Sequence, residues 1–276
     1  MKIFYDNEVD NATVTPSSEN SNFPFTALLD NRLSRFGRFT GKDSEYLIFN
    51  NTTGITLKEI LIADNNFTEN AVVKFQAHIQ NTWNNPYIDV TLTRLENGYY
   101  HYNFASVPAP ATNNFYADES GNTYSDEIGN NYSDYDKEYY IYCRLLITDD
   151  TNTTPLKISK IFIGDSLTMP GIDPSCDLST KSNSVIERNL TGQIFTDKRI
   201  QLKSGKFKFP LISESQKNEL KAFFAEVDIT DPFFLMIWEN ELEKEPPFYA
   251  VLSDNLNLKK TDSNYYSTSF EFEEVK

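Results

Sequence analysis

The sequence predicts a mainly β protein, in which a β-sandwich is followed by a smaller α+β domain. Three observations predict this class. Aromatic residues, nearly all Tyr and Phe, make up 14% of the 276 residues, and such rings suit half-buried pleated surfaces. Short apolar or alternating segments, separated by turn residues, fill the first part of the chain. After residue 170 the pattern changes, and one segment there has a helical period.

Strand-like segments before residue 170 have polar flanks and no helical period. Because each sheet must bury one face, two sheets packed face to face are the expected arrangement. The polar stretch of residues 13–22 contains Pro16 and is expected to be an irregular loop. The predicted strands are residues 46–49, 55–63, 72–79, 88–95, 99–104, 139–148 and 156–164.

An acidic, repetitive segment interrupts these strands at residues 117–138. An eight-residue unit occurs twice in tandem between residues 118 and 133. The segment is too polar to pack a core, so we expect an exposed loop or hairpin inserted in the sandwich. Its carboxylates Asp118, Asp126 and Asp134 are weak candidates for a calcium site. Their spacing does not match an EF-hand loop, and no metal site is predicted.

A small α+β domain is predicted for residues 171–276, after a first domain of residues 1–170. Ser213 is followed three residues later by Gln216, which matches a capping box and predicts that a helix begins there. One face of this helix carries Leu220, Phe223, Phe224 and Val227 at three- and four-residue steps. The predicted strands of this domain are residues 185–187, 193–196, 206–211, 233–238, 248–252 and 266–273.

The charge of the chain excludes two classes of partner. The formal net charge is −15, with 22 acidic and 12 basic residues before residue 171 and 18 and 13 after it. Neither part offers a basic face for nucleic acid or for an anionic membrane surface. No apolar run approaches the roughly 20 residues that cross a bilayer. Residues 1–6 have no apolar core segment and turn acidic at Asp6, so we do not expect them to begin a secretory signal. We therefore expect synthesis in the cytoplasm and no membrane insertion.

The sequence contains no motif that predicts catalysis. His78 and His101 are its two histidines, and neither has metal-ligand spacing. Nucleophile-elbow, Walker and dinucleotide motifs are absent. Gly164-Asp165-Ser166-Leu167 matches a lipase block, but no histidine follows Ser166. Abundant carboxylates leave a glycosidase open, although a solvated acidic surface explains them better. We predict a non-enzyme with no catalytic residue and no cofactor.

The two cysteines, Cys143 and Cys176, lie far apart in the sequence and outside any metal-ligand spacing. Two buried free thiols are expected for a chain made in the cytosol, with a disulfide left as the alternative.

A dense basic cluster consists of Arg32, Arg35 and Arg38, spaced by three residues. One interpretation is that these side chains form salt bridges to carboxylates of the same domain. The other is that they form a docking surface for an acidic neighbouring subunit.

Aromatic side chains near the middle of the first domain suggest a second binding site. Trp83, Tyr87 and Tyr100 could form a platform on which a sugar stacks. Alternation along a strand places about half of the rings of this region inside the core.

Several stretches resemble bacteriophage tail proteins that begin with a discoidin-like, or galactose-binding-like, jelly-roll sandwich. The opening resemblance lies in Ser17-Ser18-Glu19 and then in residues 23–30, of the form Phe-Pro-X-X-X-Leu-Leu-Asp, before the arginine cluster. The similarity continues at residues 46–49, 60–67, 72–75, 158–164, 188–195, 213–220 and 273–275. The tandem repeat departs from this pattern.

The resemblance implies a virion component rather than a catalyst. It would be a structural or adaptor subunit of a phage-type tail, such as a tail tip, baseplate or minor tail protein. Its partners would be other tail subunits in a homo-oligomeric ring or another multi-copy assembly. The alternative is a carbohydrate-binding module that contacts a glycan of the host surface.

Overall fold

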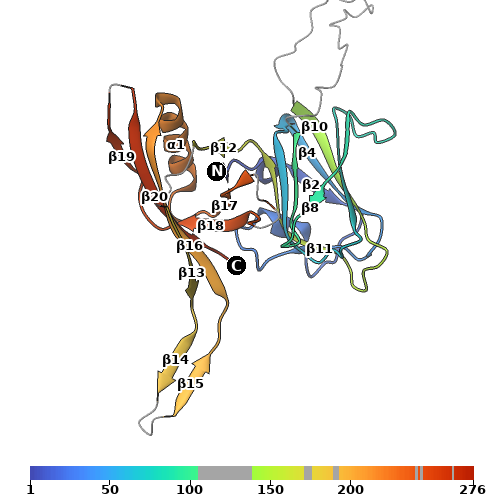
Figure 1. Ribbon diagram of the computed structural model, residues 1–276. Helices are drawn as coiled ribbons and strands as arrows, with labels where there is room; N and C mark the ends of the chain where they lie inside the picture. The colour runs from blue at the N-terminus through green and yellow to red at the C-terminus, as the bar shows by residue number, and fades with distance from the viewer. Residues whose placement is uncertain (105–138, 171–175, 189–192, 240–241, 243–244, 263) are drawn as a thin grey trace, which may run out of the picture.

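The computed structural model is a mainly β structure, as predicted, and its described part contains one α-helix (Figure 1). The described residues are 1–104, 139–170, 176–188, 193–239, 242, 245–262 and 264–276. The predicted insertion at 117–138, with Asp118, Asp126 and Asp134, lies outside them.

A sandwich of two five-stranded antiparallel sheets forms the first part of the chain, as the sequence predicts. We call one the outer sheet, in the order β2-β4-β10-β6-β7, and the other the inner sheet, in the order β3-β11-β5-β9-β8. The outer-sheet strands are β2 (Thr13–Pro16), β4 (Glu45–Thr56), β6 (Val72–His78), β7 (Ile88–Thr91) and β10 (Tyr139–Thr148). The inner-sheet strands are β3 (Gly37–Arg38), β5 (Glu59–Asn65), β8 (Thr93–Arg94), β9 (Tyr100–Asn103) and β11 (Lys157–Gly164). Two 3-10 helices, η1 (Glu8–Asn11) and η2 (Phe25–Leu29), precede β4.

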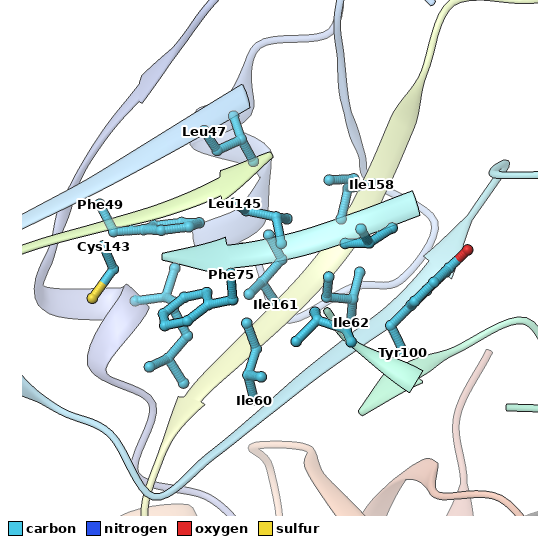
Figure 2. Close-up of a cluster of buried hydrophobic side chains, with 14 of the residues drawn as sticks. Leu47, Phe49, Ile60, Ile62, Phe75, Tyr100, Cys143, Leu145, Ile158 and Ile161 are labelled. Carbon is cyan, nitrogen blue, oxygen red and sulfur yellow. The ribbon is translucent and has the colours of Figure 1, made fainter. Parts of the chain in front are cut away.

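The sandwich core lies between the two sheets (Figure 2). Successive side chains of a strand point to opposite faces, so every second residue enters this space. On β10 these residues are Cys143, Leu145 and Ile147, all with no exposed surface. They meet Ile60 and Ile62 of β5, which are equally buried.

A third sheet, of eight strands, lies mainly in the C-terminal part, and we call it the C-terminal sheet. Its order is β12-β1-β17-β18-β20-β16-β13, with β19 also paired to β20. Its strands are β1 (Lys2–Phe4), β12 (Leu167–Thr168), β13 (Asp177–Ser182), β16 (Gln201–Ile212), β17 (Phe233–Met236), β18 (Phe248–Leu252), β19 (Asn257–Lys260) and β20 (Tyr266–Glu274). A separate two-stranded ribbon of β14 (Val185–Arg188) and β15 (Ile194–Asp197) continues from it.

Helix α1 (Glu214–Val227) covers one face of the C-terminal sheet, as the apolar spacing predicted. The predicted capping box is confirmed, because the Ser213 hydroxyl accepts from the Gln216 amide and the Gln216 side chain accepts from the Ser213 amide. Phe223 on this helix packs edge-on against Phe233 of β17, with ring centroids 5.1 Å apart.

The opposite face of the same sheet packs against the inner sheet of the sandwich, and we call this contact the joint. Phe4, Phe234 and Tyr249 approach it from the C-terminal sheet. Leu61 and Phe162 approach it from β5 and β11. Because β5 is covered on both faces, residues 59–63 are all buried.

Strand pairing does not follow the predicted domain boundary at residue 170, because two strands that precede it belong to the C-terminal sheet. Both β1 and β12 belong to the C-terminal sheet, with Ile3 opposite Leu167 and opposite Leu235. The chain thus begins in that sheet, leaves it to build the sandwich, and returns. The proposed domains, residues 1–170 and 171–276, stay a prediction.

Three details of the strand prediction differ from the structure. Residues 13–16, expected in an irregular loop, form β2, because they find backbone partners in β4. The predicted strand 55–63 is shared between β4 and β5, and 88–95 between β7 and β8. The strands β1, β3, β12, β13 and β19 were not predicted. For β1, β3 and β12 the partner strands lie far away in the sequence.

No helix in the described part of the chain is long and apolar enough to cross a membrane. Both cysteine thiols are free. Cys143 lies in the sandwich core, where burial raises the pKa of its thiol. Cys176 is half-buried beside the C-terminal core.

Candidate functional site

The outward face of the outer sheet carries a cluster of polar and aromatic side chains, which we call the recognition face. Strand register places its members in rows across the sheet. Arg144 of β10 lies between Ile48 of β4 and Gln76 of β6. Gln76 in turn lies opposite Asp89 of β7. The inner sheet covers the other face of the outer sheet, and the C-terminal sheet lies beyond the inner sheet. The recognition face is therefore directed away from the joint.

Four polar side chains, Arg144, Gln76, Asp89 and Lys74, form a connected series of hydrogen bonds and ion pairs at the centre of the recognition face. The guanidinium Nε of Arg144 donates to Gln76 Oε1 at 2.8 Å. The Gln76 amide nitrogen donates to Asp89 Oδ2 at 3.1 Å. The other oxygen of Asp89 lies 3.5 Å from the ammonium of Lys74. Each group is held by the next, so the cluster is fixed before any ligand arrives.

Two aromatic rings, those of Trp83 and Tyr46, lie next to this series of polar groups. The Arg144 guanidinium carbon lies 4.5 Å from the centroid of Trp83, which comes from the connection between β6 and β7. It also lies 5.8 Å from the centroid of Tyr46 on β4. Both distances are within the range of cation–π attraction. Trp83 and Tyr46 are half-buried, so each ring keeps some accessible surface.

A second aromatic pair extends the face along β6. Tyr87 stacks on His78 with ring centroids 4.5 Å apart and an interplanar angle of 6°. Tyr87 remains 37% exposed, so its other side is open to a ligand. The His78 Nδ1 accepts from the Gln80 amide at 2.8 Å, which fixes the ring beneath Tyr87.

The charged groups of the recognition face sum to a small net charge of +1. Burial lowers the pKa of Arg144, and the nearby Tyr46 and Asp89 oppose that shift. A guanidinium stays charged throughout the range in which proteins are stable. One arginine, one lysine and one carboxylate therefore offer both donors and acceptors within a few ångströms. Such a surface suits an uncharged ligand with many hydroxyl groups.

The expectation of a stacking site at Tyr100 is wrong. Tyr100 is 1% exposed and points into the sandwich core beside Ile62 and Ile158 (Figure 2). The alternation of β9 places it on the core side, so it cannot touch a sugar. Trp83 and Tyr87 remain accessible, and the structure places both at the recognition face.

The arginine cluster lies at another place, near η2. Arg32 and Arg35 approach the same carboxylate, Asp30, at 2.7 and 3.4 Å. Its pKa is well below the usual range because of the Arg32 hydrogen bond. Arg38 instead covers the stacked rings of Phe23 and Phe36 at 4.6 and 5.3 Å. The interpretation as internal salt bridges therefore fits Arg32 and Arg35, and docking of an acidic neighbour stays a prediction.

A buried polar cluster at the joint brings His101 and Ser166 near one carboxylate, Glu59. The Lys2 ammonium lies 2.7 Å from Glu59 Oε1, and the His101 Nε2 lies 2.9 Å from Oε2. The Ser166 hydroxyl donates to the same Glu59 at 2.9 Å. Since serine bonds to the carboxylate rather than to histidine, the nucleophile–base contact of a hydrolase is not formed. His101 and Glu59 are also 7% and 4% exposed, so the cluster is structural.

Within the described ranges, no group of three or more His, Cys, Asp or Glu side chains could hold a metal ion. The recognition face likewise offers no set of carboxylates at metal-ligand distance.

Sequence reasoning found Trp83 and Tyr87 but missed Tyr46, Gln76 and Arg144. The available signal was alternation, because residues 142, 144 and 146 share one face of a strand. What the sequence lacks is the register that places Arg144 beside Gln76, 68 residues away.

Comparison with known proteins yields structural neighbours but no family. No family model matches the chain, and no curated protein matches its sequence. Similar solved structures include chitosan-binding module 1 of a chitosanase/glucanase from Paenibacillus sp. IK-5, with 13% identity and a TM-score of 0.38 over 58% of this chain and 100% of that one. A Streptococcus pneumoniae fucose-binding module has 10% identity and a TM-score of 0.38 over 58% and 98%. A family 32 carbohydrate-binding module from C. perfringens, in complex with galactose, has 10% identity and a TM-score of 0.37 over 59% and 98%. At these values the neighbours assign neither a family nor a ligand.

Proposed function

We propose that this chain is a non-catalytic binding protein whose sandwich recognises a glycan through the recognition face. One observation carries the proposal. The rings of Trp83 and Tyr46 lie beside the hydrogen-bonded series Arg144–Gln76–Asp89, on the sheet face turned away from the joint. This was the alternative that the sequence offered.

The chemistry of a sugar matches this arrangement in two ways. The C–H groups on one side of a hexose ring are apolar and can pack on an aromatic face, whose partial negative charge attracts them. The hydroxyl groups at the ring's edge both donate and accept, as do the groups that surround Arg144. The buried Gln76 holds Arg144 and Asp89 in place, so these two side chains lose little entropy when they act on a ligand.

Binding to an array of neutral, hexose-containing glycans, followed by calorimetric titration, tests the proposal. We expect Trp83→Ala and Tyr46→Ala each to weaken binding at least about tenfold, or roughly 1.4 kcal/mol. The matched control is Tyr265→Ala, because Tyr265 is 48% exposed but belongs to the C-terminal part. No glycan binding by the wild type, or an equal loss in the control, would contradict the proposal.

A second candidate function is a structural subunit of a phage-type tail, resident in the virion. The sequence resemblance favours it, and so does one structural observation. The ribbon of β14 and β15 is exposed along its whole length, including Ile186 and Phe195 at 67% and 57%. Such apolar surface is typical of a protein that works through contacts with other subunits. Mass spectrometry of purified phage particles tests this candidate, which fails if the chain is absent from them.

A further inference from the structure

A long hairpin projects from the C-terminal sheet, and we call it the arm. It consists of β13, β14, β15 and residues 201–206 of β16. Figure 1 shows it leaving the body, with β14 and β15 at its far end. Every residue of β13, β14 and β15 is exposed. A two-stranded ribbon is at best marginally stable in water without a third strand or a packed face.

Apolar side chains lie on both faces of the far end of the arm. Register places Phe195 opposite Glu187 on one face, and Ile194 opposite Arg188 on the other. Ile186, Ile194 and Phe195 are 67%, 55% and 57% exposed. Nearby Ile200, just before β16, is 59% exposed. No described residue of the chain covers them, so the arm lacks the packing that would stabilise it as a monomer.

The charge of the arm is opposite to that of the rest of the chain. Residues 177–206 hold six basic and three acidic side chains, a net charge of +3, which leaves −18 on the remainder of a chain of −15. The base of the arm already pairs with carboxylates of its own body. Lys203 lies 2.7 Å from Glu245, and Lys206 lies 2.6 Å from Glu271. The exposed Lys198 and Arg188 lie farther along the arm.

We propose that the far end of the arm binds the acidic body of a second copy of this chain. The copy supplies carboxylates for the basic side chains and an apolar surface for the isoleucines and Phe195. The contact is heterologous, because an arm that is itself basic does not complement another arm. Repetition of such a contact gives a ring or an open filament. This inference deepens the second candidate function, and it is independent of glycan binding because the arm and the recognition face share no residue.

A membrane surface fits the arm less well than a second copy does. The face that carries Val185 and Phe195 also carries Glu187 and Asp197. Carboxylates on the apolar face oppose both insertion into hydrocarbon and attraction to anionic lipid.

Sedimentation equilibrium of the full chain tests this proposal over a range of micromolar concentrations. We expect the wild type to self-associate. Raising the salt from 0.1 M to 1 M shortens the Debye length from about 10 Å to about 3 Å, and should weaken the association. The arm variant Ile186→Ser with Phe195→Ser, altered on both faces of the ribbon, should associate at least about tenfold less well.

Two further variants make the outcome decisive. Lys198→Glu with Arg199→Glu keeps the apolar residues and should also reduce association. Leu178→Ser is the control, since Leu178 is 37% exposed but lies on β13 at the base of the arm rather than at its far end, and it should associate like the wild type. A monomeric wild type, unchanged association in both arm variants, or binding of the arm to phosphatidylserine vesicles without self-association would overturn the proposal. Absence of the chain from virions would overturn the tail assignment but not the self-association.

Discussion

The joint and the arm differ in how their apolar side chains are covered. At the joint, β1, β17 and β18 are packed between α1 and the inner sheet, and Phe234 is 2% exposed. At the arm, β14 and β15 have no layer on either face, and Phe195 is 57% exposed. Both regions are antiparallel β-structure that carries phenylalanine and isoleucine side chains. The difference shows that composition alone does not separate a core strand from an interface strand.

Ion pairs follow the same division. Lys2 and Glu59 at the joint are 2.7 Å apart, with side chains 8% and 5% exposed. Arg199 and Asp197 on the arm are 2.8 Å apart, with side chains 55% and 62% exposed. The distances are alike, but water screens the second pair and not the first. Burial rather than distance therefore decides which pair stabilises the fold.

The largest expected effect comes from removing a ring at the joint. Phe162 is 2% exposed and packs edge-on against Phe4, with ring centroids 5.3 Å apart. Phe162→Ala should lower the free energy of unfolding by about 3–5 kcal/mol, because it leaves a cavity between two layers. Phe195→Ala on the arm should change it by no more than about 0.5 kcal/mol. Urea unfolding at low protein concentration measures both, and similar costs would refute the comparison.

A smaller effect is expected from the buried carboxylate. Glu59→Gln keeps the shape of the side chain but removes the charge that faces Lys2 and His101. We expect a loss of about 1.5–3 kcal/mol, the range for a hydrogen bond to a charged group. The control is Asp197→Asn, which removes the charge of the exposed pair and should cost about 0–1 kcal/mol. Equal losses would show that the joint is as hydrated as the arm.

The smallest expected effect is a fall in the free energy of unfolding at acidic pH, caused by protonation of Glu59. Burial tends to raise the pKa of Glu59, but hydrogen bonds from His101 and Lys2 outweigh it and lower the pKa below its ordinary 4.5. A lowered pKa in the folded state adds stability above pH 4.5, and this is lost as the pH falls through the folded value. Urea midpoints of wild type and Glu59→Gln should therefore converge below about pH 4.5. A constant gap between the two down to pH 3 would assign the stabilisation to packing rather than charge.

Local signals in the sequence were enough for most individual elements. The Ser213–Gln216 capping box and the spacing of Leu220 and Phe223 are contained within one turn or two, so α1 could be predicted to the residue. Strands such as β10 and β18 have long apolar or alternating runs and were predicted with correct bounds. In contrast, β1 is three residues long and is a strand because of β17, more than 200 residues away. Such an element has no local signal.

The candidate site was less predictable than the fold for a related reason. Rings were visible in the sequence, but whether each faces the core or the solvent depends on sheet pairing. Tyr100 and Tyr87 are both tyrosines flanked by similar polar and aromatic sequence, yet Tyr100 is 1% exposed and Tyr87 is 37% exposed. Likewise, Arg144 has no sequence motif, and its position beside Gln76 and Trp83 follows from the register of three strands and a connection.

The pairing of β1 with β12 has a consequence for how this molecule could change over time. Since Ile3 and Leu167 face each other on adjacent strands, the chain enters and leaves the sandwich at points about 5 Å apart. A folded unit whose two ends lie so close together can be exchanged for another without altering its host. The sandwich could then be replaced by another whose inner sheet offers the joint a similar apolar surface, while the C-terminal sheet and the arm keep their own strand pairing.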